Sequence, residues 1–78
     1  MKKKHLLTRI AVNQKIKRGK PVIKGTWLTV EYILNLLVCG STIEAILDEY
    51  QGLTQEDIQA CFLFATKSME STSIHAII

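Results

Sequence analysis

The apolar positions between residues 41 and 65 recur at helical spacing in two runs that are separated by a glycine. Ser41 followed by Glu44 is typical of a capping box at the start of a helix, and Thr54 followed by Asp57 repeats the pattern. Gly52 supplies the positive φ that the end of a helix commonly requires. This segment therefore predicts a helix-turn-helix, and the apolar face of its first helix contains Ile43, Ile46, Leu47 and Tyr50.

A further helix is expected before this pair, and the last helix should run from about Gln55 to Ser68. Thr29 is expected to cap the earlier helix and Gly40 to end it, and its stripe contains Val30, Ile33, Leu34 and Leu37. The face that the last helix is expected to turn toward the core contains Ile58, Cys61, Phe62, Ala65 and Met69.

The first 28 residues have short alternating runs and breakers in place of helical spacing. A frayed tail is expected over residues 1–4, and the alternation of residues 6–12 favours a short strand over a lone helix. Gly19-Lys20-Pro21 turns the chain back, so that residues 22–23 and 26–28 can form a second strand. The expected fold class is mainly α, with a three-helix helix-turn-helix (winged-helix-like) core and a short N-terminal β-hairpin or arm. We expect one domain, with a flexible basic tail over residues 1–7, the arm over 8–28, the core over 29–69 and a C-terminal tail over 70–78.

The helices carry more apolar residues than one face of each can hold. Leu36, Leu63 and Phe64 fall outside the stripes, and the apolar end of the chain includes Ile77. In so short a chain this surplus predicts a partner surface, most simply a symmetric homodimer, with these four residues as candidate contacts. The alternative is that the β arm and the C-terminal tail cover the same faces within one subunit.

Charge divides the chain sharply. Nine of the ten lysines and arginines lie within the first 24 residues and no acid does, whereas one lysine faces seven acids from residue 25 onward, which gives formal charges of +9 and −6. Such asymmetry favours a basic arm that contacts a polyanion, although a lysine-rich start can also serve only to keep a small protein in solution.

Nucleic acid is the polyanion that this pattern favours. The acids Glu56 and Asp57 at the start of the last helix oppose ordinary reading of the major groove, whereas glutamine can pair with adenine. Phosphate contacts are therefore expected from the basic segment, and base contacts can come from the glutamines, although exposed helix surface is the preferred explanation of both glutamines. The candidate residues are Arg9, Lys15, Lys17, Arg18, Lys20, Lys24, Gln55 and Gln59.

Other chemistry finds little support in the sequence. Lys24-Gly25-Thr26 has the wrong order for a phosphate-binding loop, and His5 and His75 have no ligands at metal-binding spacing. Cys39 and Cys61 are expected to be free thiols in a reducing cytosol, because neither has a partner at metal spacing. No apolar run approaches the length of a membrane span. We expect a cytoplasmic protein that is not an enzyme, with no cofactor, metal or small-molecule substrate.

A set of residues from Ile10 to Ala65 resembles the bacterial family called domain of unknown function four-three-three. The resemblance is carried by Gly19-Lys20-Pro21-Val22-Ile23-Lys24-Gly25-Thr26, the run from Val30 to Leu37, Gly40-Ser41, Glu44, Ile46, Tyr50, Leu53-Thr54 and Asp57-Ile58. It implies a small helix-turn-helix-like protein with a short N-terminal β element, of a kind often encoded beside PIN-like proteins. It thereby implies a candidate antitoxin that binds its toxin and represses its own operon.

Three positions depart from the pattern of that family. Trp27 stands where the family usually has arginine, Gln51 where it has proline, and Phe64 where it commonly has tyrosine. Loss of the arginine removes a charged contact, whereas Gly52 can still make the turn without the proline. Two hypotheses remain: an antitoxin or DNA-binding regulator, and a protein-interaction adaptor that dimerises and binds a partner without contacting DNA.

Overall fold

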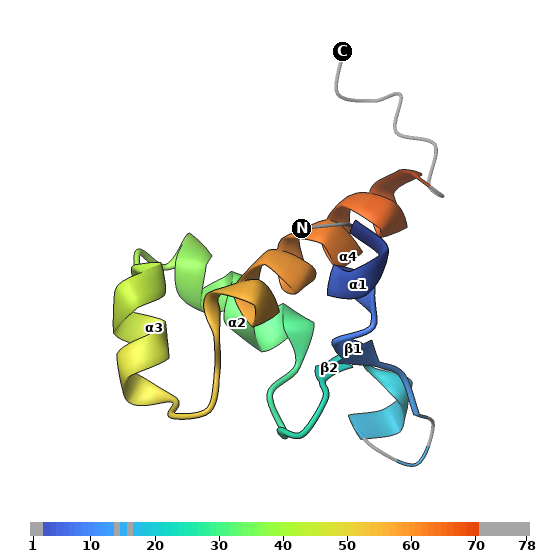
Figure 1. Ribbon diagram of the computed structural model, residues 1–78, viewed down its shortest axis with the longest axis horizontal. Helices are drawn as coiled ribbons and strands as arrows, with labels where there is room; N and C mark the ends of the chain where they lie inside the picture. The colour runs from blue at the N-terminus through green and yellow to red at the C-terminus, as the bar shows by residue number, and fades with distance from the viewer. Residues whose placement is uncertain (1–2, 14, 16, 71–78) are drawn as a thin grey trace.

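The computed structural model describes residues 3–13, 15 and 17–70 (Figure 1). Within them the protein is mainly helical, with a short antiparallel hairpin near its N-terminus, as the sequence predicts. The elements are α1 (Lys3–Leu7), β1 (Ile10–Ala11), the 3-10 helix η1 (Lys17–Gly19), β2 (Val22–Ile23), α2 (Val30–Val38), α3 (Ile43–Glu49) and α4 (Gln55–Glu70). The longest helix, α4, contacts α1, β1, α2 and α3 and joins the two ends of the fold.

The N-terminal segment forms a helix where the sequence predicts part of a frayed tail and the start of a strand. Residues Lys3–Leu7 are helical, and β1 is confined to Ile10–Ala11. An extended chain would point Leu6 and Leu7 to opposite faces, whereas neighbouring residues of a helix lie about 100° apart and can reach the same surface. α1 packs against α4, and both leucines are half-buried. Packing on a distant helix has therefore overridden the local alternation.

The hairpin is short and is braced on both sides of β2. Ile10 pairs with Ile23 and Ala11 with Val22, while Val22 also bridges to Thr29 at the start of α2. A tight turn leads out of β2, in which the amide of Thr26 donates to the carbonyl of Ile23 at 3.1 Å. Gly25 occupies the third position of this turn with φ of 80°, as a type II turn requires.

The predicted caps of α2 and α4 are confirmed. The hydroxyl oxygen of Thr29 accepts from the amide of Tyr32 at 3.0 Å. At the start of α4 the amide of Thr54 donates to the Asp57 carboxylate at 3.0 Å, and the Asp57 amide donates to the Thr54 hydroxyl at 3.3 Å. This reciprocal pair is a capping box. Three residues separate the Tyr50 cap of α3 from Thr54, and Gly52 among them has the expected positive φ, 98°.

The cap of α3 is Thr42, so the prediction of Ser41 is wrong. The Thr42 hydroxyl accepts from the amide of Ala45 at 3.1 Å. Ser41 instead belongs to the end of α2, because its amide donates to the carbonyl of Leu36 at 3.0 Å while the amide of Gly40 donates to Leu37 at 3.1 Å. These two bonds, with Gly40 at φ of 103°, form a Schellman motif. Because Ser41 is part of this motif at the end of α2, the next helix is capped one residue later, by Thr42.

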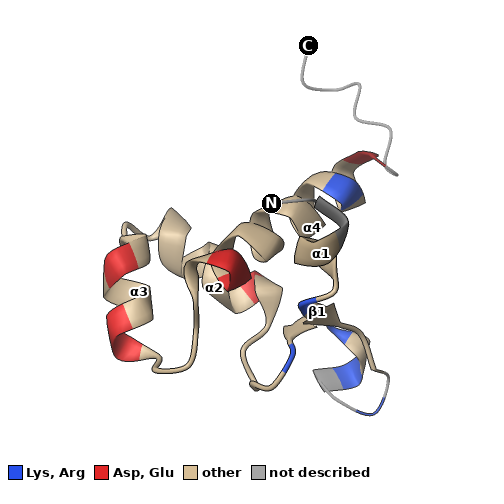
Figure 2. Cartoon of the chain, viewed as in Figure 1, with Lys and Arg blue, Asp and Glu red and all other residues tan. Residues whose placement is uncertain are grey.

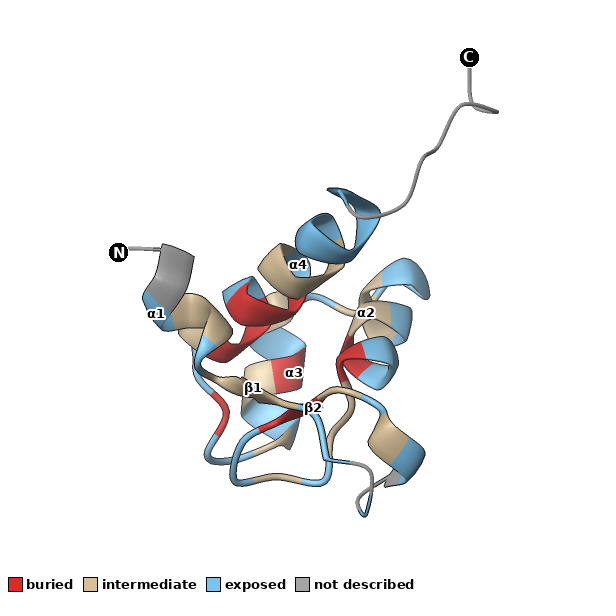
Figure 3. Cartoon of the chain, turned by 90° about the vertical axis from the view of Figure 1, so that its right-hand side faces the viewer, coloured by how far each residue is buried: buried red, intermediate tan, exposed pale blue. Residues whose placement is uncertain are grey.

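The core lies where α2, α3 and α4 meet β2 (Figure 3). Its buried apolar residues are Ile23, Val30, Ile33, Ile46, Leu53, Ile58 and Cys61. The expected core face of α4 is partly wrong, since Phe62 and Met69 are 45% and 56% exposed whereas Phe64 packs against the core. α4 contacts α2, α1 and β1. As a result, the face of α4 that is buried is the one that carries Asp57, Ala60 and Cys61.

Candidate nucleic-acid interface

Basic and acidic residues are concentrated in different parts of the fold (Figure 2). Most lysines and arginines lie on the hairpin, on η1 and on the turn that follows β2, whereas acids gather on α2, on α3 and at the start of α4. Lys15, Arg18, Lys20 and Lys24 are all exposed. The asymmetry of the sequence is therefore retained in space, with a basic hairpin end and an acidic helical body.

Arg9 has a structural partner that the sequence analysis missed. Its guanidinium Nη1 lies 3.1 Å from Oδ1 of Asp57, whose side chain is 9% exposed. Asp57 also caps α4, so this one carboxylate joins the start of the hairpin to the start of the last helix. The capping box identified Asp57 as an N-terminal residue of a helix, but nothing local in the sequence indicates that Arg9, 48 positions away, would reach it.

The other cations differ in how far they are already neutralised. Lys20 Nζ lies 3.0 Å from Glu31 Oε1 on α2, in an exposed pair that contributes little to stability. Lys15, Arg18 and Lys24 form no ion pair with the residues that the structure describes. The side chain of Lys17 lies outside the described part of the chain. Three exposed cations near the hairpin are thus available for an external anion.

The predicted base-reading glutamines belong to a different element from these cations. Gln55 and Gln59 are exposed on α4, whereas the free cations lie on the segments before α2. The helix-turn-helix pair formed by α3 and α4 also carries five exposed or half-exposed acids, Glu44, Asp48, Glu49, Glu56 and Glu70. These charges oppose the approach of phosphate, so the helix-turn-helix is the less favourable face for nucleic acid.

The predicted interface residues are partly covered within the subunit. Leu36, Leu63 and Phe64 are half-buried, and both Leu36 and Phe64 pack against the core. Ile77 lies outside the described residues. The most exposed large apolar side chains of the helices are instead Val38, at 82%, Met69 and Phe62. The sequence indicates surplus apolar surface on the helices, but the elements that pack against α4 decide that Phe62 rather than Phe64 contributes to it.

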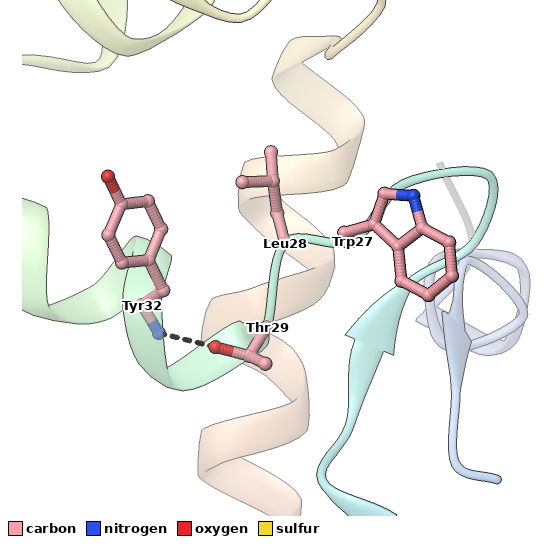
Figure 4. Close-up of a pocket in the computed structure, with 4 residues that line it drawn as sticks. All are labelled: Trp27, Leu28, Thr29 and Tyr32. Atoms are coloured by element: carbon pink, nitrogen blue, oxygen red, sulfur yellow. Dashed lines mark hydrogen bonds between the residues drawn. The ribbon is translucent and has the colours of Figure 1, made fainter. Parts of the chain in front are cut away.

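Aromatic side chains lie beside the basic turn. Trp27, Leu28, Thr29 and Tyr32 line a shallow pocket of about 270 Å³, in which Leu28 stands between the indole on the hairpin side and the phenol on the α2 side (Figure 4). The hydroxyls of Tyr32 and Tyr50 are 2.6 Å apart, and their rings meet edge to face. This hydrogen bond, assisted by partial burial and by Glu49, raises the pKa of Tyr50 to about 12.

Metal binding and thiol chemistry depend on histidine, cysteine and acidic side chains. The described residues contain no cluster of three or more histidines, cysteines and acids that could bind a metal. Burial, and then the nearby Asp57 carboxylate, raise the pKa of the Cys61 thiol to about 12, so this thiol stays protonated at neutral pH and is a poor nucleophile. Cys39 is exposed at the end of α2. No helix within the described residues is long and apolar enough to cross a membrane.

Comparison with known proteins identifies the fold and the family. A crystal structure described as that of a DUF433 member protein from Anabaena variabilis ATCC 29413 matches with a TM-score of 0.76 and 24% sequence identity, over 87% of this chain and 67% of that chain. At this identity the match establishes a shared fold. A search of curated proteins finds no match. The family described as "Protein of unknown function (DUF433)" matches residues 10–65, the range over which the sequence resembles it. Since this match covers more than half of the sequence, the chain belongs to the DUF433 family.

Proposed function

We propose that this protein is a non-enzymatic regulator, of the antitoxin type, whose basic hairpin end contacts nucleic acid. The observation that carries the proposal is the separation of charge in the fold. Lys15, Arg18 and Lys24 are exposed near the hairpin and form no ion pair with described residues, whereas the acids lie on the helices. Phosphate contacts of this kind release counterions, so they supply affinity that falls steeply with salt.

The proposal assigns the surfaces in a definite way. The hairpin end and the turn after β2 face the nucleic acid, while the acidic face of α3 points elsewhere. Arg9 acts chiefly through its bond to Asp57, which holds the hairpin against α4. Gln55 and Gln59 then act as base contacts only where a bound nucleic acid also reaches α4.

Binding of a labelled fragment of the protein's own promoter, followed by anisotropy at several salt concentrations, tests the proposal. Replacing Lys15, Arg18 and Lys24 together by glutamine is expected to reduce the slope of log affinity against log salt by about three, since each lost phosphate contact removes about 0.9. The matched control replaces Glu44, Asp48 and Glu49 on α3 by their amides, which should leave the slope unchanged or raise the affinity slightly. An absence of binding at low salt contradicts the proposal.

A second candidate function is supported by the exposed apolar side chains of α2 and α4. Val38, Phe62 and Met69 suit a protein contact, either with a second copy of the chain or with a PIN-like toxin. In this alternative the protein is an adaptor that does not touch DNA. Light scattering gives the mass in solution, and copurification with the product of the neighbouring gene after nuclease treatment tests the toxin contact. Phe62→Ser and Val38→Ser should weaken either contact while the hairpin variants do not.

A further inference from the structure

Trp27 is held in an unusual position for a tryptophan. The residue is 72% exposed, more than Tyr32 or Phe62. Large aromatic side chains gain most of their free energy from burial, so a tryptophan left in water on an ordered segment indicates a surface that is covered in a complex. The indole lies on the hairpin side of Leu28, away from the helical core (Figure 4).

The backbone around Trp27 is fixed by hydrogen bonds on both sides. The Thr26 hydroxyl donates to the carbonyl of Ile23 at 2.8 Å and accepts from the amide of Leu28 at 3.0 Å. The amide of Ile23 in turn donates to the carbonyl of Leu28 at 2.9 Å, which closes the loop onto buried β2. The indole is thus presented from a rigid loop, and little backbone entropy is lost when a ligand covers it.

The charge of this loop selects the class of ligand. Lys24, in the turn that leads to Trp27, is exposed and forms no ion pair with the described residues. No acid occurs from residue 1 to residue 30, so every lysine or arginine near Lys24 and Trp27 in the sequence adds positive charge that no neighbouring acid offsets. An exposed aromatic ring three residues along the same loop from an exposed cation suits a ligand that combines a flat π surface with negative charge, which is the chemistry of a nucleotide chain.

We propose that Trp27 stacks on an unpaired nucleic-acid base while Lys24 contacts a neighbouring phosphate. The base must be unpaired because a base within a duplex already has both faces covered by its neighbours, whereas a single-stranded segment leaves a face open. The inference rests on the proposed function, because the same basic hairpin end provides the remaining phosphate contacts. It specifies single-stranded nucleic acid as the ligand, and it adds Trp27 as a contact residue that neither the charge pattern nor the helix-turn-helix indicates.

The chain contains a single tryptophan, so its fluorescence reports on this position alone. The experiment titrates the full chain with an oligothymidylate of about 15 nucleotides, the upper range of such sites, and follows both tryptophan emission and the anisotropy of a label on the oligonucleotide. We expect quenching that saturates together with the anisotropy. A blunt duplex of the same length should bind with much less quenching, and a comparison of oligodeoxyuridylate with oligouridylate shows whether the sugar matters.

Substitutions separate stacking from charge. Trp27→Ala is expected to weaken binding of the oligothymidylate by about 5- to 100-fold, whereas Trp27→Phe, which keeps a stacking face, should stay within about threefold of the original. Lys24→Gln should lower the salt slope by about one. Gln51→Ala changes an exposed side chain between α3 and α4 and serves as the control, with affinity unchanged. Circular dichroism confirms that each variant is folded.

The outcomes separate this inference from the proposed function. If the protein binds nucleic acid but the emission is not quenched and Trp27→Ala binds normally, the stacking role is wrong while the nucleic-acid function stands. Equal quenching by the duplex overturns the requirement for an unpaired base. A blue shift of emission that depends on protein concentration, without nucleic acid, means that Trp27 is buried in a contact between subunits and overturns the inference. Failure of every nucleic acid to bind removes the proposed function and this inference together.

Discussion

The helical body and the hairpin end are held together by different kinds of interaction. In the body, α2, α3 and α4 bury apolar residues such as Ile33, Ile46 and Ile58 almost completely. The hairpin has two residues in each strand, and it is anchored by Ile23 in the core and by the ion pair between Arg9 and Asp57. A two-stranded ribbon of this length is marginal alone, so the body supplies stability while the hairpin end displays charge.

The same contrast separates residues that look alike in the sequence. Arg9 and Lys24 both belong to the basic segment, but Arg9 bonds to a nearly buried carboxylate whereas Lys24 extends into solvent from a turn. A positive charge in this segment is therefore either part of the structure or free for a ligand. A cation of this segment is structural where a nearly buried acid of the helical body lies within reach of it, as Asp57 does for Arg9.

The largest expected effect is on the apolar interior of the body. Ile58→Ala should lower the free energy of unfolding by about 2–5 kcal/mol, because the side chain is fully buried and its loss leaves a cavity. Ile10→Ala in the half-buried β1 should cost about half as much. Urea denaturation followed by circular dichroism measures both values. Equal losses at the two sites would contradict the division of roles between body and hairpin.

The next effect concerns the bond between the two regions. Arg9→Ala is expected to cost about 1–2 kcal/mol, between the values for exposed and buried pairs, since Arg9 is partly exposed while Asp57 is nearly buried. Asp57→Asn should cost a similar amount because Asp57 also caps α4. In a double-mutant cycle with Arg9→Ala the two losses should not add, with a coupling energy of about 0.5 kcal/mol or more. Full additivity would show that the pair does not connect the hairpin to the body.

A smaller effect tests the start of α3. Thr42→Ala should destabilise the protein by about 1 kcal/mol, since it removes the acceptor for the Ala45 amide, whereas Ser41→Ala should cost only a few tenths. The Ser41 side chain is not needed, because its backbone amide makes the bond that ends α2. Thermal unfolding of the two variants side by side distinguishes them, and the reverse order would restore Ser41 as the cap.

The smallest effect is expected for the exposed ion pair between Lys20 and Glu31. Lys20→Gln should change the free energy of unfolding by less than about 0.5 kcal/mol, because both side chains are well solvated. The same substitution should nevertheless weaken binding of a polyanion measurably at low salt, since it removes a charge near the hairpin. Parallel measurements of stability and of binding test this contrast. A large loss of stability would place Lys20 with Arg9 as a structural cation.

Local physical chemistry determined much of the protein from its sequence. Thr29 and Thr54 could be identified as caps, and Gly40 and Gly52 as helix ends, because a cap and a positive φ depend on a few neighbouring residues. The family could be identified from motifs within residues 10–65. The charge asymmetry could likewise be identified from the order of the residues, and the candidate site is based on it.

Tertiary packing decided the rest, because it depends on residues that are distant in the chain. Lys3–Leu7 forms a helix that packs against α4. The elements that pack against α4 leave Phe62 exposed and bring Phe64 against the core. The bond between Arg9 and Asp57 spans 48 positions, and the loop that displays Trp27 is closed onto a strand buried in the core. Hydrophobic periodicity indicates that a face exists, but the direction of that face is set by the elements that pack against it.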